Sequence, residues 1–309
     1  MPAAGTRTAG PISLTDMLRE LVEQAGPPPA VDRERCAELA TTIGEHAVRV
    51  ITPAPFPAVA QRVLQIAGQP ETDLNELVGV VQRDAAVAAA LLRVANSAAY
   101  RTQSSVTTLR AALGLLGMQT VVEVVMGTTG ADMFAATPRD RALFPGAWET
   151  MFQEAMANAF TAGRLALEHP AGRGERALLA GLLTDIGAPT ALRALIHAVR
   201  VGIPTPEPHL ATAAIDTAAV SIRDHVLGSL GLPAELLTAC IPDRDLPSLD
   251  AQLAQLASAI GAIQRRSTRM WACAADVRAI AERMQIAPLV LRSWFGLRAQ
   301  ERMRVHEML

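Results

Sequence analysis

The sequence contains no lysine, so all 28 of its basic residues are arginine. Aromatic residues are scarce, at 3% of the chain, which leaves few side chains on which the bases of a single-stranded nucleic acid could stack. The formal net charge is −2, so the chain lacks the overall basic character that is typical of nucleic-acid-binding domains. We attribute the arginine-only pattern to the base composition of the genome and not to function.

Several signatures of metal sites, cofactors and export are also missing. The three cysteines, Cys36, Cys240 and Cys273, lie far apart and form no CxxC or CxxxC spacing, so we expect no cysteine metal site. The chain also lacks GxxxxGK followed by Ser or Thr, GxGxxG at the start of a helix, GxSxG and HExxH. The N-terminal residues lack the apolar core of a signal peptide, and no uninterrupted apolar run approaches the ~20 residues of a membrane helix. We therefore expect a cytoplasmic protein with no membrane segment.

What the chain does contain is a helical pattern along most of its length. Half of the residues are hydrophobic and 19% are charged, which is enough apolar material for a large core. Much of it is alanine and leucine, which head the helix propensity scale. Apolar residues recur at three- and four-residue steps, as at Leu39, Ile43, Ala47 and Val50, and we find no convincing alternating strand. The sequence therefore predicts an all-α protein.

Proline-rich interruptions divide the chain into parts. The main boundary falls in ITPAPFPAVA (residues 51–60), because proline lacks the backbone donor that a helix interior needs. The amphipathic helix predicted over residues 31–50 could pack against a second copy of the chain, which would make a homodimer. The predicted parts are a flexible tail over residues 1–12, an N-terminal helical segment over residues 13–52, a main domain over residues 53–250, and arginine-rich C-terminal helices over residues 251–309 that pack on the main domain or extend it.

Four segments of the main domain match the pattern of one known family, in the same order. The first ends in LLRVANSAAY (residues 91–100), and the second is SSVTTLRAALGLLGMQTVVEVV (residues 104–125). The third is LLAGLLTDIG (residues 178–187), and the fourth is DHVLGSLGLPAELLTACI (residues 224–241). Together they resemble the HDOD domain, the HD-related output domain, which is a branch of the HD-domain superfamily. The resemblance implies a multi-helical HD-like bundle with extra N- and C-terminal helices.

The resemblance also locates a metal site that this sequence has largely lost. The first histidine of the superfamily would fall near Thr150, its His-Asp pair has become Thr184-Asp185, and a later His-His pair falls near residues 242–243. Of the implied ligands only Asp185 and His225 remain, and two ligands do not hold a divalent ion tightly in water. We therefore expect no metal, no other cofactor and no catalytic residue. The positions that could instead form a pocket for a small ligand are Thr150, Thr184, Asp185, His225 and Asp243.

Some of these residues also have an ordinary structural interpretation. Asp185 could cap the helix that follows it or bond nearby backbone amides, as aspartate commonly does at helix ends, or it could form the floor of a polar pocket. His225 is either a satisfied surface or core histidine, or a ligand. Asn96 and Ser97 are predicted to be structural, because such side chains bond the backbone where a helix ends.

The C-terminal segment holds nine arginines between Arg265 and Arg304, against three acidic residues. Such a run is usually the solvated face of an amphipathic helix. Alternatively, it forms a basic contact surface for an acidic partner or for nucleic acid. The residues of that candidate surface are Arg265, Arg266, Arg269, Arg278, Arg292 and Arg298.

The resemblance implies a bacterial, non-enzymatic signalling module that acts through a protein partner or a small ligand such as a nucleotide. One alternative is a nucleic-acid-binding regulator that uses the C-terminal arginines. Another is a divergent metal-dependent phosphohydrolase, in which the metal would activate a bound water. Its rebuilt site would consist of Asp185, His225 and Asp243 with Asp216 or Asp224.

Overall fold

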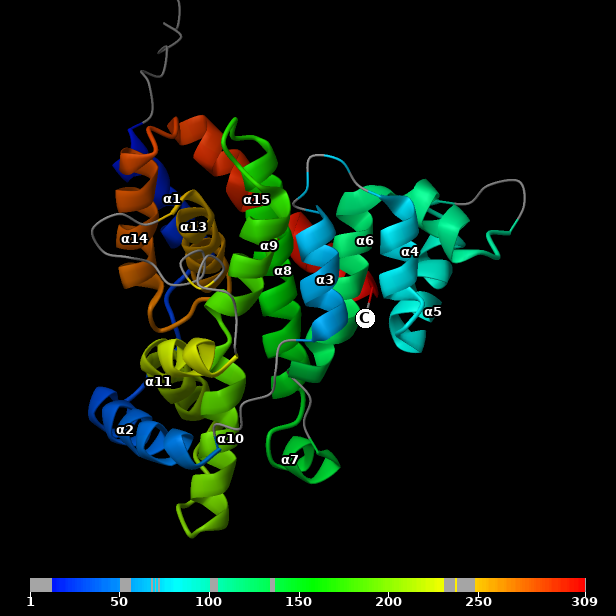
Figure 1. Ribbon diagram of the computed structural model, residues 1–309. Helices are drawn as coiled ribbons and strands as arrows, with labels where there is room; N and C mark the ends of the chain where they lie inside the picture. The colour runs from blue at the N-terminus through cyan, green and yellow to red at the C-terminus, as the bar shows by residue number, and fades with distance from the viewer. Residues whose placement is uncertain are drawn as a thin grey trace, which may run out of the picture.

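The computed structural model describes residues 13–50, 57–67, 69, 71, 73–100, 105–133, 137–230, 237 and 248–308. Within these residues the chain folds into helices and contains no strand, which confirms the predicted all-α class (Figure 1). The helices are α1 (Leu14–Ala25), α2 (Arg33–Val50), α3 (Ala58–Ala67), α4 (Leu74–Val81), α5 (Ala85–Ala95), α6 (Leu109–Met133), α7 (Pro138–Leu143), α8 (Ala147–Leu167), α9 (Gly174–Thr184), α10 (Gly187–Arg200), α11 (Pro208–Ser229), α13 (Leu249–Gln264), α14 (Met270–Arg283) and α15 (Pro288–Met308).

Helices α3 to α6 form a lobe. Local side chains fix where several of these helices begin and end. Asp73 caps α4 and Asp84 caps α5, because each carboxylate accepts hydrogen bonds from the first free backbone amides of its helix. Asn96 closes the α5–α6 connection: its amide donates to the Val106 carbonyl and its side-chain oxygen accepts from the Val106 amide. The predicted structural role of Asn96 is therefore confirmed. Gly117 adopts a φ of 72° and kinks α6 there.

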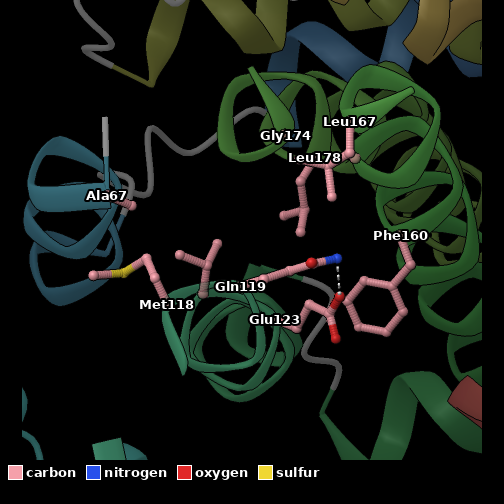
Figure 2. A pocket seen from close by; sticks show the side chains of 10 residues that line it. Ala67, Met118, Gln119, Glu123, Phe160, Leu167, Gly174 and Leu178 are labelled. Atoms are coloured by element: carbon pink, nitrogen blue, oxygen red, sulfur yellow. Dashed lines mark hydrogen bonds between the residues drawn. The ribbon is translucent and has the colours of Figure 1, made fainter. Parts of the chain in front are cut away.

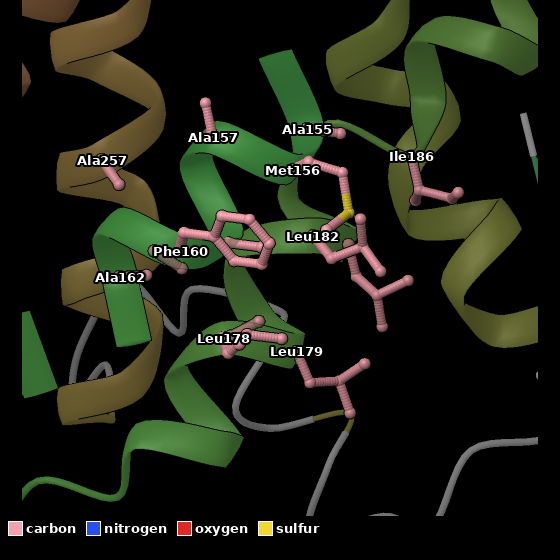
Figure 3. Close-up of a cluster of buried hydrophobic side chains, with 14 of the residues drawn as sticks. Ala155, Met156, Ala157, Phe160, Ala162, Leu178, Leu179, Leu182, Ile186 and Ala257 are labelled. Carbon is pink, nitrogen blue, oxygen red and sulfur yellow. The ribbon is translucent and has the colours of Figure 1, made fainter. Parts of the chain in front are cut away.

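The long helix α8 and the shorter helix α9 form the centre of the molecule. Figure 1 shows the α3–α6 lobe on one side of this pair, with α2, α11, α13 and α14 on the other. Met156 and Phe160 of α8 pack against Leu178 and Leu182 of α9 in a buried cluster (Figure 3). Gly181 allows the two helices to approach closely, since a Cβ there would lie 2.8 Å from the Cα of Ala159.

The two N-terminal helices, α1 and α2, pack onto other helices of the molecule. Helix α1 contacts α13, α14 and α15, whereas α2 contacts α10 and α11. Leu39, Ile43 and Ala47 of α2 are buried, so the apolar face that could have met a second copy is covered by the same chain. His46 of α2 and His197 of α10 lie with their Nδ1 atoms 2.8 Å apart, so one ring donates a hydrogen bond and the other accepts it.

Two described segments are long and apolar enough to cross a membrane by composition, Leu109–Gly130 and Arg176–Arg200. Half of the first apolar window and 78% of the second are buried inside the protein. Both are interrupted by an acidic residue, Glu123 in the first and Asp185 in the second. Core helices of soluble proteins pass the same test, so these segments are accounted for as the core helices α6, α9 and α10.

The glycine of the LLTDIG segment is required by packing. Gly187 begins α10, and a Cβ there would lie 2.0 Å from the carbonyl oxygen of Ala219 in α11. Any larger residue would therefore push the start of α10 away from α11, and backbone cannot yield as a flexible side chain can.

We expect Gly187→Ala to lower the free energy of unfolding by about 3 kcal/mol, the upper end of the usual cost of overpacking. Chemical denaturation measures the change. Gly44→Ala is the matched control, because Gly44 lies inside α2 with nothing within 4 Å of its missing Cβ. That change should raise stability by up to ~1 kcal/mol, since alanine favours a helix. Similar effects of the two changes would contradict the proposed close approach.

Candidate functional site

Asp185 lies at the junction of α9 and α10 and is held by side chains from two other helices. Its Oδ2 accepts a hydrogen bond of 2.6 Å from the Nδ2 of Asn158 in α8. Its Oδ1 accepts one of 2.9 Å from the hydroxyl of Ser258 in α13. The N-cap of α10 is Ile186 and has no side-chain cap bond, so the capping role considered for Asp185 is wrong. Asp185 instead ties three helices together.

The other positions implied by the resemblance do not gather around Asp185. The hydroxyl of Thr184 donates a hydrogen bond of 2.7 Å to the carbonyl oxygen of Ala180, one turn earlier in α9. Thr150 is exposed on α8, eight residues before Asn158 and therefore about 12 Å from it along the helix. Asp243 lies outside the described residues.

The residues of the alternative hydrolase site are also dispersed among separate contacts. His225 is exposed on α11, with its Nδ1 3.3 Å from the carbonyl oxygen of Ser221. Asp216 accepts a hydrogen bond of 2.6 Å from the Ser267 hydroxyl, and Asp224 pairs with its neighbour Arg223. Across the described part of the chain, no three His, Cys, Asp or Glu side chains are grouped as metal ligands would be.

A buried chain of polar groups leads away from Asp185. The Oδ1 of Asn158 accepts a hydrogen bond of 2.9 Å from the Nε of Arg298 in α15, and Nη2 of Arg298 donates to Glu154 at 2.7 Å. Arg298 and Asn158 are both fully buried. The second oxygen of the Glu154 carboxylate pairs with Arg302 at 2.9 Å. The sequence of these contacts is Ser258–Asp185–Asn158–Arg298–Glu154, and it joins α8, α9, α13 and α15.

The charges of these hydrogen-bonded side chains disfavour binding of a divalent cation. Burial lowers the pKa of Arg298, and the carboxylate of Glu154 opposes that shift. Burial also acts to lower the pKa of Arg265, but the carboxylates of Asp216, Asp185 and Glu154 outweigh it and raise that pKa. Guanidinium groups stay charged at neutral pH, so two positive charges already accompany the carboxylates of Asp185 and Glu154. The residues present therefore do not fit a metal ion.

Sequence reasoning missed Asn158, Glu154 and Ser258 and misplaced Arg298. The available signal was the pair of polar residues four apart in the apolar run QEAMANAF, which puts both on one face of α8. A second pair four apart, Arg298 and Arg302, faces them from α15. Polar residues on a face that is otherwise buried indicate partners on a neighbouring helix.

The six arginines of the predicted contact surface do not form one basic surface. Arg298 is fully buried, so the prediction that it belongs to a contact surface is wrong. Arg292 pairs with Glu20 and attaches α15 to α1, and Arg265 lies 3.7 Å from Glu154. Arg269 is half-buried, whereas Arg266 and Arg278 are exposed. The arginine run mainly serves contacts within the chain.

A cavity of about 210 Å³ lies elsewhere, between the α3–α6 lobe and the α8–α9 pair. Glu123, Phe160 and Leu178 line it (Figure 2). It includes none of the positions that the resemblance marks as former ligands. The expected pocket at those positions and the cavity in the structure are therefore different places.

We expect Arg298→Met to lower the free energy of unfolding by about 3 kcal/mol, because it leaves Glu154 buried with less compensation. The double change Arg298→Met with Glu154→Gln should cost less than the sum of the two single changes, since the residues act as a pair. Urea denaturation of all three variants measures both effects. Arg278→Met is the control, because its pair with Glu282 is exposed and contributes at most ~0.5 kcal/mol. Additive costs for Arg298 and Glu154 would contradict the coupling.

Solved structures of several other proteins share this fold. A protein from Marinobacter aquaeolei named as a signal transduction protein matches with a TM-score of 0.61 at 20% identity, over 96% of this chain and 64% of its own. A protein from Shewanella amazonensis named as a metal-dependent phosphohydrolase matches with a TM-score of 0.55 at 18% identity, over 88% of this chain and 99% of its own. An HDOD domain protein of unknown function from Geobacter sulfurreducens matches with a TM-score of 0.55 at 15% identity, over 96% and 98%. At these identities the likeness shows the fold.

The family assignment comes from the sequence of the main domain. Residues 54–228 match the model of the HDOD domain, beginning one residue after the predicted start of that domain and ending before residue 250. A search of curated proteins finds no match. The matched residues make up more than half of the chain and include the LLTDIG segment and Asp185. The chain therefore belongs to the HDOD domain family.

Proposed function

We propose that this chain is a non-enzymatic regulatory module of bacterial signal transduction, acting through a protein partner or a small ligand. The observation that carries the proposal is the state of Asp185, the acidic residue that remains of the His-Asp pair. Both of its carboxylate oxygens accept hydrogen bonds from buried or half-buried side chains, Asn158 and Ser258. A carboxylate held in this way joins helices, and the nearby guanidinium groups of Arg265 and Arg298 disfavour a metal ion beside it.

The relatives support the proposal only in part. One structural relative is named as a signal transduction protein and another as a metal-dependent phosphohydrolase. The hydrolase alternative requires ligands around Asp185, and here that residue is accompanied by the guanidinium groups of Arg298 and Arg265. Positive charge at this place favours a structural role and disfavours an added cation.

The nucleic-acid alternative has less support from the contacts. Phosphate binding needs exposed guanidinium groups, and Arg298 and Arg292 are engaged with Glu154 and Glu20.

We place the protein in the cytoplasm. In support, Cys36 and Cys273 are both free thiols, as is usual in a reducing compartment.

Metal binding and hydrolysis together test the non-enzymatic proposal. The full chain, incubated with Mn²⁺, Fe²⁺ or Zn²⁺ and then desalted, is analysed for bound metal and for hydrolysis of bis(p-nitrophenyl) phosphate. We expect bound metal far below one ion per chain and no hydrolysis that depends on Asp185. The physical reason is that the guanidinium groups of Arg265 and Arg298 already balance negative charge around this carboxylate, so an added cation would be repelled.

Two variants separate a specific site from background. Asp185→Asn keeps the size of the side chain while removing its charge, and Glu282→Gln makes the same kind of change on the exposed surface of α14, away from every candidate ligand. One metal ion per chain together with phosphodiesterase activity, both lost in Asp185→Asn and kept in Glu282→Gln, would overturn the proposal. Adventitious metal would respond equally to both changes.

A further inference from the structure

The cavity lies at the seam between the two parts of the molecule. One wall belongs to the α3–α6 lobe and the other to α8 and α9, and these parts touch only sparsely elsewhere. Figure 2 shows Met118 and Ala67 at one end of the cavity, and Phe160 and Glu123 at the other. Leu178 of α9 lies across from α6. The walls are therefore mainly apolar, with one polar end.

The polar end of the cavity is the buried carboxylate of Glu123, which can accept one more hydrogen bond. Glu123 is 2% exposed, and its Oε2 accepts a hydrogen bond of 2.6 Å from the Nη2 of Arg304. Its Oε1 accepts only a long bond of 3.3 Å from the amide of Gln119. A carboxylate oxygen can accept two hydrogen bonds, so Oε1 can accept another from a molecule in the cavity.

The charges around this end are already balanced. Arg304 pairs with Glu123 and with Glu301, and Glu301 pairs with Arg164 at 2.7 Å. Burial acts to lower the pKa of Arg304, but the two carboxylates outweigh it and raise that pKa, so the guanidinium remains charged. Two carboxylates thus face two guanidinium groups. A charged ligand would add an unpaired charge to a desolvated site, so the complementary ligand is neutral.

The volume sets the size of the ligand. An engineered apolar cavity of about 150 Å³ holds benzene, so the 210 Å³ here suits a molecule on the order of ten non-hydrogen atoms. Phe160 offers an aromatic ring at the polar end, with Arg304 5.4 Å from the ring centroid. A flat aromatic ligand would pack against this ring and the aliphatic side chain of Leu178.

We propose that the cavity binds a small, neutral aromatic molecule whose N–H or O–H group donates a hydrogen bond to the Glu123 carboxylate. Such a ligand would contact both walls of the seam and hold the α3–α6 lobe against α8 and α9. The inference rests on the proposed regulatory function and gives its small-ligand input a site and a chemical class.

Indole is a suitable probe, because it is neutral, aromatic and of the right size, and carries one N–H donor. Indene has nearly the same shape and lacks the donor. Isothermal titration calorimetry of the full chain should show one indole per chain and binding of indene at least roughly tenfold weaker, since a hydrogen bond to a charged group is lost. This comparison needs no variant. Absence of indole binding, or equal affinity for the two compounds, would overturn the inference.

Ala67→Phe locates the binding by filling the cavity from α3. It should weaken indole binding at least roughly tenfold by occupying the volume, whereas Ala37→Phe, the same change at an exposed position of α2, should leave affinity unchanged. Unchanged binding in Ala67→Phe would place indole elsewhere and sink the proposal. Failure here leaves the regulatory function intact, because that function is tested by metal content and hydrolysis. Conversely, a hydrolytic metal site at Asp185 would not alter the indole result.

Discussion

The guanidinium of Arg298 lies fully buried between the carboxylate of Glu154 and the amide of Asn158, and Asn158 in turn holds Asp185. A buried charge of this kind is tolerated only with partners in good geometry, so α15 must keep its position against α8, which supplies both partners. The centre of the fold therefore depends on a polar contact that is surrounded by apolar packing. The same contact occupies Asp185, the residue from which a metal site would have to start.

The LLTDIG segment is accounted for by structure, residue by residue. Leu182 and Leu183 are fully buried, and the hydroxyl of Thr184 donates a hydrogen bond to the carbonyl of Ala180. Asp185 joins helices through Asn158 and Ser258, and Gly187 permits the close approach of α10 and α11. Each of these residues has a packing reason that requires no chemistry, so the segment keeps its place in the fold with threonine at position 184.

Arginines of α15 reach two different parts of the molecule. Arg298 joins it to α8 through Glu154, and Arg304 joins it to α6 through Glu123. The second of these pairs stands at the polar end of the seam cavity. Helix α15 therefore contacts both the buried centre and the seam, and it is an integral part of the fold.

Local physics determined much of this protein from the sequence: the three- and four-residue apolar steps predicted the all-α class, and Asn96 was predicted to bond the backbone where its helix ends. Four ordered motifs predicted the family, and the family model confirms it over residues 54–228. The partners of Asp185 and Arg298 could not be predicted, because Arg298 and Asn158 are 140 residues apart. Periodicity shows which face of a helix is apolar, but only tertiary packing decides which helix covers it. Tertiary packing buries Arg298, which was expected at the surface. It also places the cavity away from the positions that the resemblance implied for a pocket.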